Sequence, residues 1–99
     1  MKFKYWKSSE KSKAIRKGTS YFVNGGDYED QILVFMEEKN DLYGFLTIPL
    51  QKNLWVPKEK FDFALQEVII EFVEHLPNHV IEVTDAKFQE NLSELRSTP

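Results

Sequence analysis

The sequence contains no cysteine, and its longest uninterrupted apolar run is only Ile32–Met36. The lack of cysteine excludes disulfides, thiol nucleophiles and cysteine-ligated zinc or iron–sulfur sites. The short run falls far below the roughly 20 apolar residues that a membrane-spanning helix needs. Residues 1–7 also lack the apolar core of a signal peptide. We therefore expect a cytoplasmic protein that does not cross a membrane.

Glycine and proline are scarce, with four of each in 99 residues, which excludes collagen-like and low-complexity chains. What is abundant is hydrophobic (41%) and charged (29%) residues, and 14% of the chain is aromatic. This composition predicts one folded domain over residues 1–99, too small for a multi-domain enzyme. Within it we expect a polar, mobile loop at residues 7–13 and a frayed tail at residues 97–99.

Alternating and β-branched segments predict strands over residues 2–6, 19–23, 31–37 and 42–48. Residues 24–27 and 38–41 carry the Asn, Asp and Gly residues that favour turns. The strand at residues 31–37 is apolar on both faces, so we expect it at the centre of the sheet. Gly44, inside a strand, marks a bulge or a tight crossing.

After Pro57 the spacing of apolar residues changes to that of a helix, which predicts a long α-helix over residues 58–76. The apolar stripe of that helix is Phe61, Leu65, Val68, Ile69, Phe72 and Leu76. A short strand at residues 80–83 and a C-terminal helix at residues 85–96 follow. The predicted fold is α+β, an antiparallel meander of about four to five strands packed on one face by the two helices.

On a helix spanning residues 58–76, Phe63 and Ile70 stack two turns apart on the face opposite the stripe, with Val73 at the border. We expect a second copy to cover this ridge, which makes the protein a homodimer. In the alternative interpretation, the C-terminal helix of the same chain covers it. Three acidic residues lie beside the ridge, Glu67, Glu71 and Glu74. They indicate either a solvated face or a docking surface for a basic protein partner.

We therefore predict a small cytoplasmic protein-interaction module that acts by surface complementarity, without catalysis, cofactor or metal. The first alternative is a small-ligand-binding protein or minor enzyme, with a pocket between sheet and helix. Its aromatic lining would be Trp55, Tyr43 and Phe45, although such residues more commonly form ordinary core. The second alternative is single-stranded nucleic-acid binding through the basic N-terminal strand, by Lys2, Lys4, Trp6 and Lys7.

The charges are divided unevenly along the chain. Residues 1–17 hold seven basic side chains against Glu10, a balance of +6, and residues 18–99 carry −9. An acidic body repels phosphate, which counts against nucleic-acid binding. The basic end can instead lie against the acidic surface of the protein itself or of another subunit.

Other motifs give weaker signals. His75 and His79 have the i, i+4 spacing of a metal pair, but Pro77 between them ends a helix, so we expect no shared site. The acidic cluster at residues 27–30 does not have the pattern of a calcium loop, and no glycine-rich phosphate loop is found.

Overall fold

The computed structural model describes residues 15–97. The strands and helices follow one another in the order β1 (Thr19–Val23), β2 (Ile32–Lys39), β3 (Leu42–Ile48), β4 (Asn53–Pro57), α2 (Lys58–Gln66), β5 (Ile70–His75) and α3 (Asn78–Ser97). The predicted α+β class is confirmed. The strand predicted at residues 2–6 and the loop predicted at residues 7–13 lie outside the described residues.

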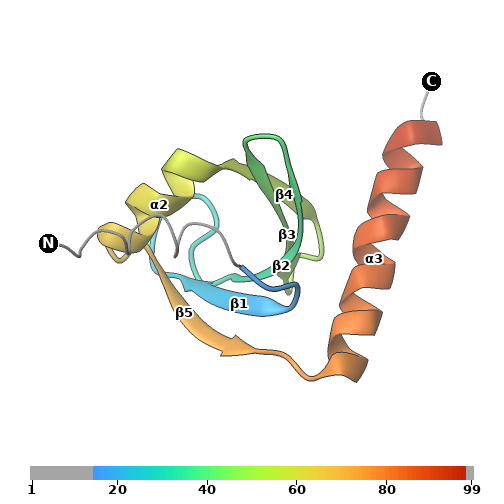
Figure 1. The fold of residues 1–99 in the computed structure, drawn as a ribbon, viewed down its shortest axis with the longest axis horizontal. Helices are drawn as coiled ribbons and strands as arrows, with labels where there is room; N and C mark the ends of the chain where they lie inside the picture. The colour runs from blue at the N-terminus through green and yellow to red at the C-terminus, as the bar shows by residue number, and fades with distance from the viewer. Residues whose placement is uncertain (1–14, 98–99) are drawn as a thin grey trace, which may run out of the picture.

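The strands form one antiparallel sheet in the order β4-β3-β2-β1-β5. The first four follow each other as a meander, and β5 then returns from the far end of the chain to pair with β1. The apolar strand β2 lies at the centre, as the sequence predicts. Figure 1 shows the sheet curling round, with α2 across its open side and α3 standing outside it.

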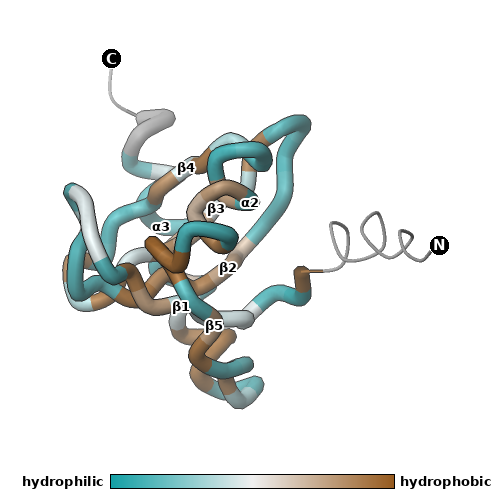
Figure 2. Tube along the Cα trace, turned by 90° about the vertical axis from the view of Figure 1, so that its left-hand side faces the viewer, coloured by the Kyte–Doolittle hydropathy of each residue, from teal (hydrophilic) through white to brown (hydrophobic). Residues whose placement is uncertain are grey.

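The curled sheet separates two hydrophobic clusters, because successive strand side chains point to opposite faces. Leu33 and Phe35 of β2 belong to the inner cluster, whereas Val34 and Met36 belong to the outer one. The inner cluster is rich in aromatic residues, namely Tyr21, Phe35, Tyr43, Phe45 and Phe61. Figure 2 shows hydrophobic residues concentrated in the strands and hydrophilic ones in the outer loops.

The two helices pack against different faces of the sheet, not against one face as the sequence analysis expected. Phe61 of α2 lies in the inner cluster and stacks on Phe45 at 5.5 Å between ring centroids. Phe88 of α3 is fully buried in the outer cluster, 5.7 Å from the ring of Trp55. Each face of the sheet therefore has its own helix.

The predicted helix over residues 58–76 is wrong beyond residue 66. The helix ends at Gln66, Val68 adopts a left-handed backbone with φ of 57°, and residues 70–75 form β5. The run Val68–Ile69–Ile70 is β-branched, and such residues fit a pleated strand better than a helix. Pairing of Val23 with Ile70 and of Phe22 with Glu71 then fixes this segment in the sheet.

The strand predicted at residues 80–83 is also wrong, because α3 begins at Asn78 and includes these residues. Val80, Thr84, Phe88 and Leu92 recur every four residues, and all are at least partly buried. This helical spacing outweighs the β-propensity of the valines and isoleucine. The helix starts directly after Pro77, whose carbonyl accepts hydrogen bonds from the amides of Val80 and Ile81.

Candidate interaction surface

Most of the exposed large hydrophobic side chains come from one short stretch of chain. Six of the eight in the described residues lie between residues 63 and 73, whereas Leu50 and Val83 are elsewhere. The six, called the apolar strip below, are Phe63, Leu65, Val68, Ile69, Phe72 and Val73. The strip runs from α2 through the connecting turn into β5, at the left and lower side of Figure 1. Exposed apolar residues that gather in this way are typical of binding surfaces.

Four consecutive residues of β5, Glu71 to Glu74, are exposed, and a β-bulge lies among them. Ser20 pairs with Glu74 and Tyr21 pairs with Phe72, so Val73 has no opposite residue on β1. The bulge interrupts the alternation of side chains. Phe72 is 62% exposed and contacts the inner cluster only at its edge, through the ring of Tyr21 at 6.3 Å. Its outer face is therefore available to another molecule.

Asn24 holds the turn between α2 and β5 in place. Its backbone amide donates to the carbonyl of Ile69 at 2.7 Å, and its side-chain amide donates to the carbonyl of Val68 at 2.9 Å. The same side chain also donates to a carboxylate oxygen of Glu71 at 3.3 Å. These bonds fix the backbone of the apolar strip although its side chains face outward.

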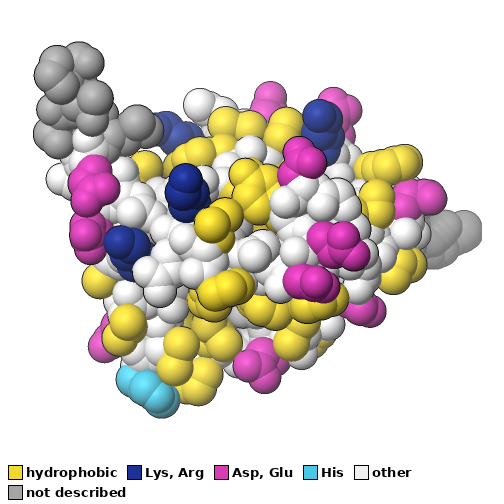
Figure 3. Space-filling view, turned by 180° about the vertical axis from the view of Figure 1, so that it is seen from behind, with side chains coloured by type: hydrophobic (Ala, Val, Ile, Leu, Met, Phe, Trp, Pro, Cys, Tyr) yellow, Lys and Arg dark blue, Asp and Glu magenta, His cyan; other side chains and the backbone are white. Residues whose placement is uncertain are grey.

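The strip lies in an acidic environment. Residues 61–74 include four carboxylates, those of Asp62, Glu67, Glu71 and Glu74, and no lysine or arginine. In the view from behind, hydrophobic side chains gather with Asp and Glu side chains beside them (Figure 3). The surface thus combines apolar contact area with negative charge.

The predicted Phe63–Ile70 ridge does not exist, because its two members lie on different elements. Phe63 is 57% exposed on α2, whereas Ile70 is buried in the inner cluster from β5. Of the acidic residues, Glu67 follows the end of α2, and Glu71 and Glu74 belong to β5, so they form no helical stripe. Phe63 and Val73 are exposed, as the ridge required.

Sequence reasoning missed Leu65 of α2, which it assigned to a buried helical stripe. It also missed Val68, Ile69 and Phe72, which follow α2 and were assigned to the same stripe. Their signal was the β-branched and aromatic content of residues 68–73, which favours a strand. Once residues 70–75 are taken as a strand, the helical positions no longer indicate which side chains are buried.

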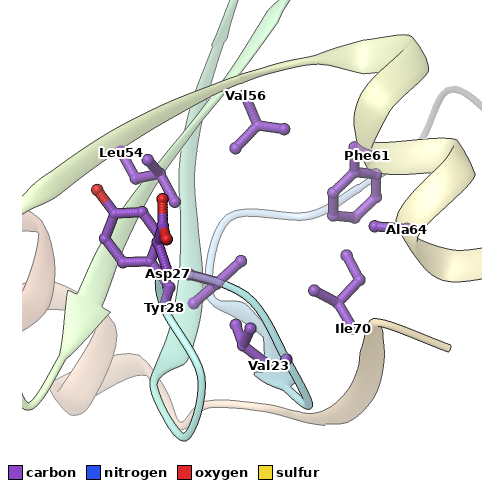
Figure 4. Close-up of a pocket in the computed structure, with 10 residues that line it drawn as sticks. Val23, Asp27, Tyr28, Leu54, Val56, Phe61, Ala64 and Ile70 are labelled. Carbon is purple, nitrogen blue, oxygen red and sulfur yellow. The ribbon is translucent and has the colours of Figure 1, made fainter.

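The predicted aromatic pocket is also absent. Tyr43 and Phe45 are buried in the inner cluster, whereas Trp55 lies on the outer face of the sheet against Phe88. A cavity does lie between the sheet and α2, but its lining is mainly aliphatic and includes none of these three residues (Figure 4).

The two histidines belong to different elements. His75 ends β5 with its Nδ1 atom 3.4 Å from the hydroxyl of Thr19, and His79 is exposed in the first turn of α3. No group of three potential metal ligands occurs among residues 15–97. Lys2, Lys4, Trp6 and Lys7 lie outside the described residues, so the nucleic-acid alternative stays a prediction.

Within the described part of the chain, no helix combines the length and apolarity needed to cross a bilayer. Comparison of the chain with protein-family models, with curated proteins and with solved structures gave no match. A function is therefore inferred from the geometry and chemistry of the structure, and the apolar strip with its carboxylates is the candidate site.

Proposed function

We propose that this chain is a small cytoplasmic protein-interaction module that binds a basic segment of another protein at the apolar strip. The observation that carries the proposal is the concentration of exposed hydrophobic side chains in residues 63–73, within a segment (residues 61–74) that carries four carboxylates and no lysine or arginine. Apolar contact supplies binding energy, and the carboxylates supply steering and specificity.

The position of β5 in the sheet supports this proposal. β5 is the last strand in the sheet order and pairs on one side with β1. Among residues 15–97, no strand pairs with its other side. An edge strand presents alternate backbone amides and carbonyls to which an extended peptide can add as a further strand. The bulge at Val73 limits such pairing to a short segment.

Charge favours a basic partner over a second copy. If two copies of β5 paired symmetrically about the midpoint between Phe72 and Val73, Glu71 of each copy would face Glu74 of the other. Like charges directly opposite in a sheet are destabilising. An extended segment that alternates lysine or arginine with apolar residues would instead place cations beside these carboxylates. The homodimer predicted from the sequence is accordingly the competing outcome.

The backbone of Val68 gives independent support. A β-branched residue with φ of 57° is strained, and Val68 is also 57% exposed. The exposed side chain gains little from burial within this molecule, so it does not compensate for the strain. Strained residues of this kind are found at functional sites.

The test uses a synthetic peptide of about eight residues that alternates lysine with phenylalanine or valine, titrated into the full chain by calorimetry. We expect the double variant Phe72→Ser/Val73→Thr to weaken binding by about tenfold or more, because it removes the exposed core of the surface. The matched control is Val83→Ser, which changes a hydrophobic residue on α3 that is even more exposed than Phe72 and Val73. It should bind as the wild type does.

Two further measurements make the result decisive. A peptide with glutamate in place of lysine should bind much more weakly, and added salt should weaken only the basic peptide. Equal binding of both peptides would contradict the proposal. Light scattering gives the oligomeric state of both proteins. If the wild type is a dimer and Phe72→Ser/Val73→Thr is a folded monomer, the molecule that binds the apolar strip is a second copy and not a basic partner.

A further inference from the structure

A cavity of about 150 Å³ lies under the loop between β1 and β2, where the sheet and α2 meet. Its walls come from the inner face of the sheet, from α2 and from this loop, as Figure 4 shows. Most of the lining is aliphatic or aromatic carbon, including Val23, Leu54, Val56, Phe61, Ala64 and Ile70. The polar side chains in the lining are Asp27 and Tyr28, both from the loop.

The fold explains why this space is empty of side chains. β4 and β5 are the two ends of the sheet and do not pair, so α2 fills the gap between them. Phe61 of α2 reaches the aromatic inner cluster, but Ala64, one turn later, carries only a methyl group. The side chain of Ala64 is therefore too small to fill the space between α2 and the sheet.

The wall formed by the loop is held by backbone hydrogen bonds. The amide of Val23 donates to the carbonyl of Gln31 at 3.0 Å, and the amide of Asp30 donates to the carbonyl of Val23 at 2.9 Å. The amide of Gln31 also donates to the carbonyl of Tyr28 at 3.0 Å. A ligand would thus enter a largely preformed site and would not have to order the loop.

We propose that this cavity binds a compact apolar amine, a molecule with a hydrocarbon body about the size of a benzene ring and one ammonium group. A cavity of roughly this volume, lined by apolar side chains, is known to accept benzene in another protein. The hydrocarbon body would leave water for the apolar walls, which is favourable. The exposed carboxylate of Asp27, at the loop side, would pair with the ammonium. This site is separate from the apolar strip and does not depend on the proposed function.

The experiment compares benzylamine, benzene and benzoate as probes with the full-length chain. Binding is followed by NMR shifts of the methyl groups of Val23, Val56 and Ile70, which line the cavity. We expect benzylamine to bind more tightly than benzene by about two- to fivefold, the range of an exposed ion pair, and benzoate to bind most weakly. Asp27→Asn should remove the difference between benzylamine and benzene without reducing the affinity for benzene.

A second set of variants tests the cavity itself. Ala64→Leu should fill the space and weaken both benzylamine and benzene by about tenfold or more, whereas Ala86→Leu, at an exposed position of α3, should leave both unchanged. If Ala64→Leu does not fold, the smaller change Ala64→Val provides the same test, with Ala86→Val as its control.

The proposal fails if saturating benzylamine and benzene leave the methyl signals of the cavity unshifted. It also fails if a folded variant with a filled cavity binds both probes as the wild type does. Equal affinity for benzylamine, benzene and benzoate would overturn the assignment of an amine.

Discussion

At the scale of single residues, Gly44 is a position where the packing allows no side chain. A Cβ atom built on Gly44 would lie 2.7 Å from the ring of Trp55, its pairing partner on β4. The register between β2 and β3 also shifts opposite Gly44, between Phe35 and Glu37 of β2. The sequence analysis predicted a bulge or a tight crossing at Gly44, and the structure contains both.

We expect Gly44→Ala to lower the free energy of unfolding by about 1–3 kcal/mol, because the methyl group must displace the indole ring or the backbone. Urea denaturation followed by Trp fluorescence measures the change. Gly25→Ala is the matched control, since its Cβ atom meets nothing within 4 Å. It should alter stability by less than about 1 kcal/mol. Equal losses in the two variants would show that steric contact with Trp55 is not the cause.

The misplaced aromatic pocket is also explained at this scale. Tyr43 and Phe45 flank Gly44, so they point to the face of the sheet opposite to it. Trp55 pairs with Gly44 and covers it, which places the indole on that other face. The alternation within β3 was readable from the sequence, but the pairing of β3 with β4 was not, because the sequence predicted no strand between residue 48 and Pro57.

At the scale of elements, strands with strong local patterns were predicted well and the last third of the chain was not. The predicted bounds of β1 and β3 match the structure, and the turn at residues 24–27 falls between β1 and β2. Of the turn predicted at residues 38–41, only residues 40–41 lie between strands, because β2 continues to Lys39. Between residues 58 and 76, helical spacing and strand propensity indicate different structures. The sheet decides between them, since the open side of β1 accepts residues 70–75. Such a choice depends on tertiary pairing, which local sequence does not specify.

The change from α2 to β5 depends on a left-handed residue that is not glycine. Val68→Gly should raise the free energy of unfolding by about 0.5–1 kcal/mol, because it relieves a left-handed strain of about 1–2 kcal/mol at some cost in chain entropy. Val83→Gly, in the regular helix α3, should instead lower stability by about 0.5 kcal/mol. Urea denaturation of the two variants checks the opposite signs. A loss of stability in Val68→Gly would mean that the valine side chain contributes more than the strain costs.

At the scale of the whole molecule, the α+β class followed from the order of the predicted strands and helices, and the central position of β2 followed from the apolar residues on both its faces. The strand order did not, because nothing in the local sequence directs β5 past three strands to β1. The candidate site had the same limit. Its acidic residues and the exposed Phe63 and Val73 were recognised, but Leu65, Val68, Ile69 and Phe72 were predicted to be buried because the prediction assumed one helix.

The stability of the whole molecule should fall at alkaline pH through its aromatic inner cluster. Burial raises the pKa of Tyr21 above its usual value of 10.0, and the nearby Tyr43 phenol adds to the rise. Burial also raises the pKa of Tyr43, although Lys58 acts in the opposite direction. A phenol with a raised pKa in the folded protein ionises first in the unfolded chain. Stability is therefore kept below about pH 10 and lost as the pH rises further.

Urea denaturation at about pH 8 and about pH 11 measures this loss. Tyr21→Phe keeps the ring but cannot ionise, so its stability should decline less between the two pH values than that of the wild type. The same slope in both proteins would show that other groups control alkaline unfolding.

The separation of the two hydrophobic clusters by one sheet has a consequence for how this chain tolerates mutation. The clusters share no buried residue, and each has its own helix. Energetic losses from substitutions on opposite faces should therefore be close to additive. Each face can then drift in sequence independently, provided that the sum of the losses stays within the small stability margin of a single domain.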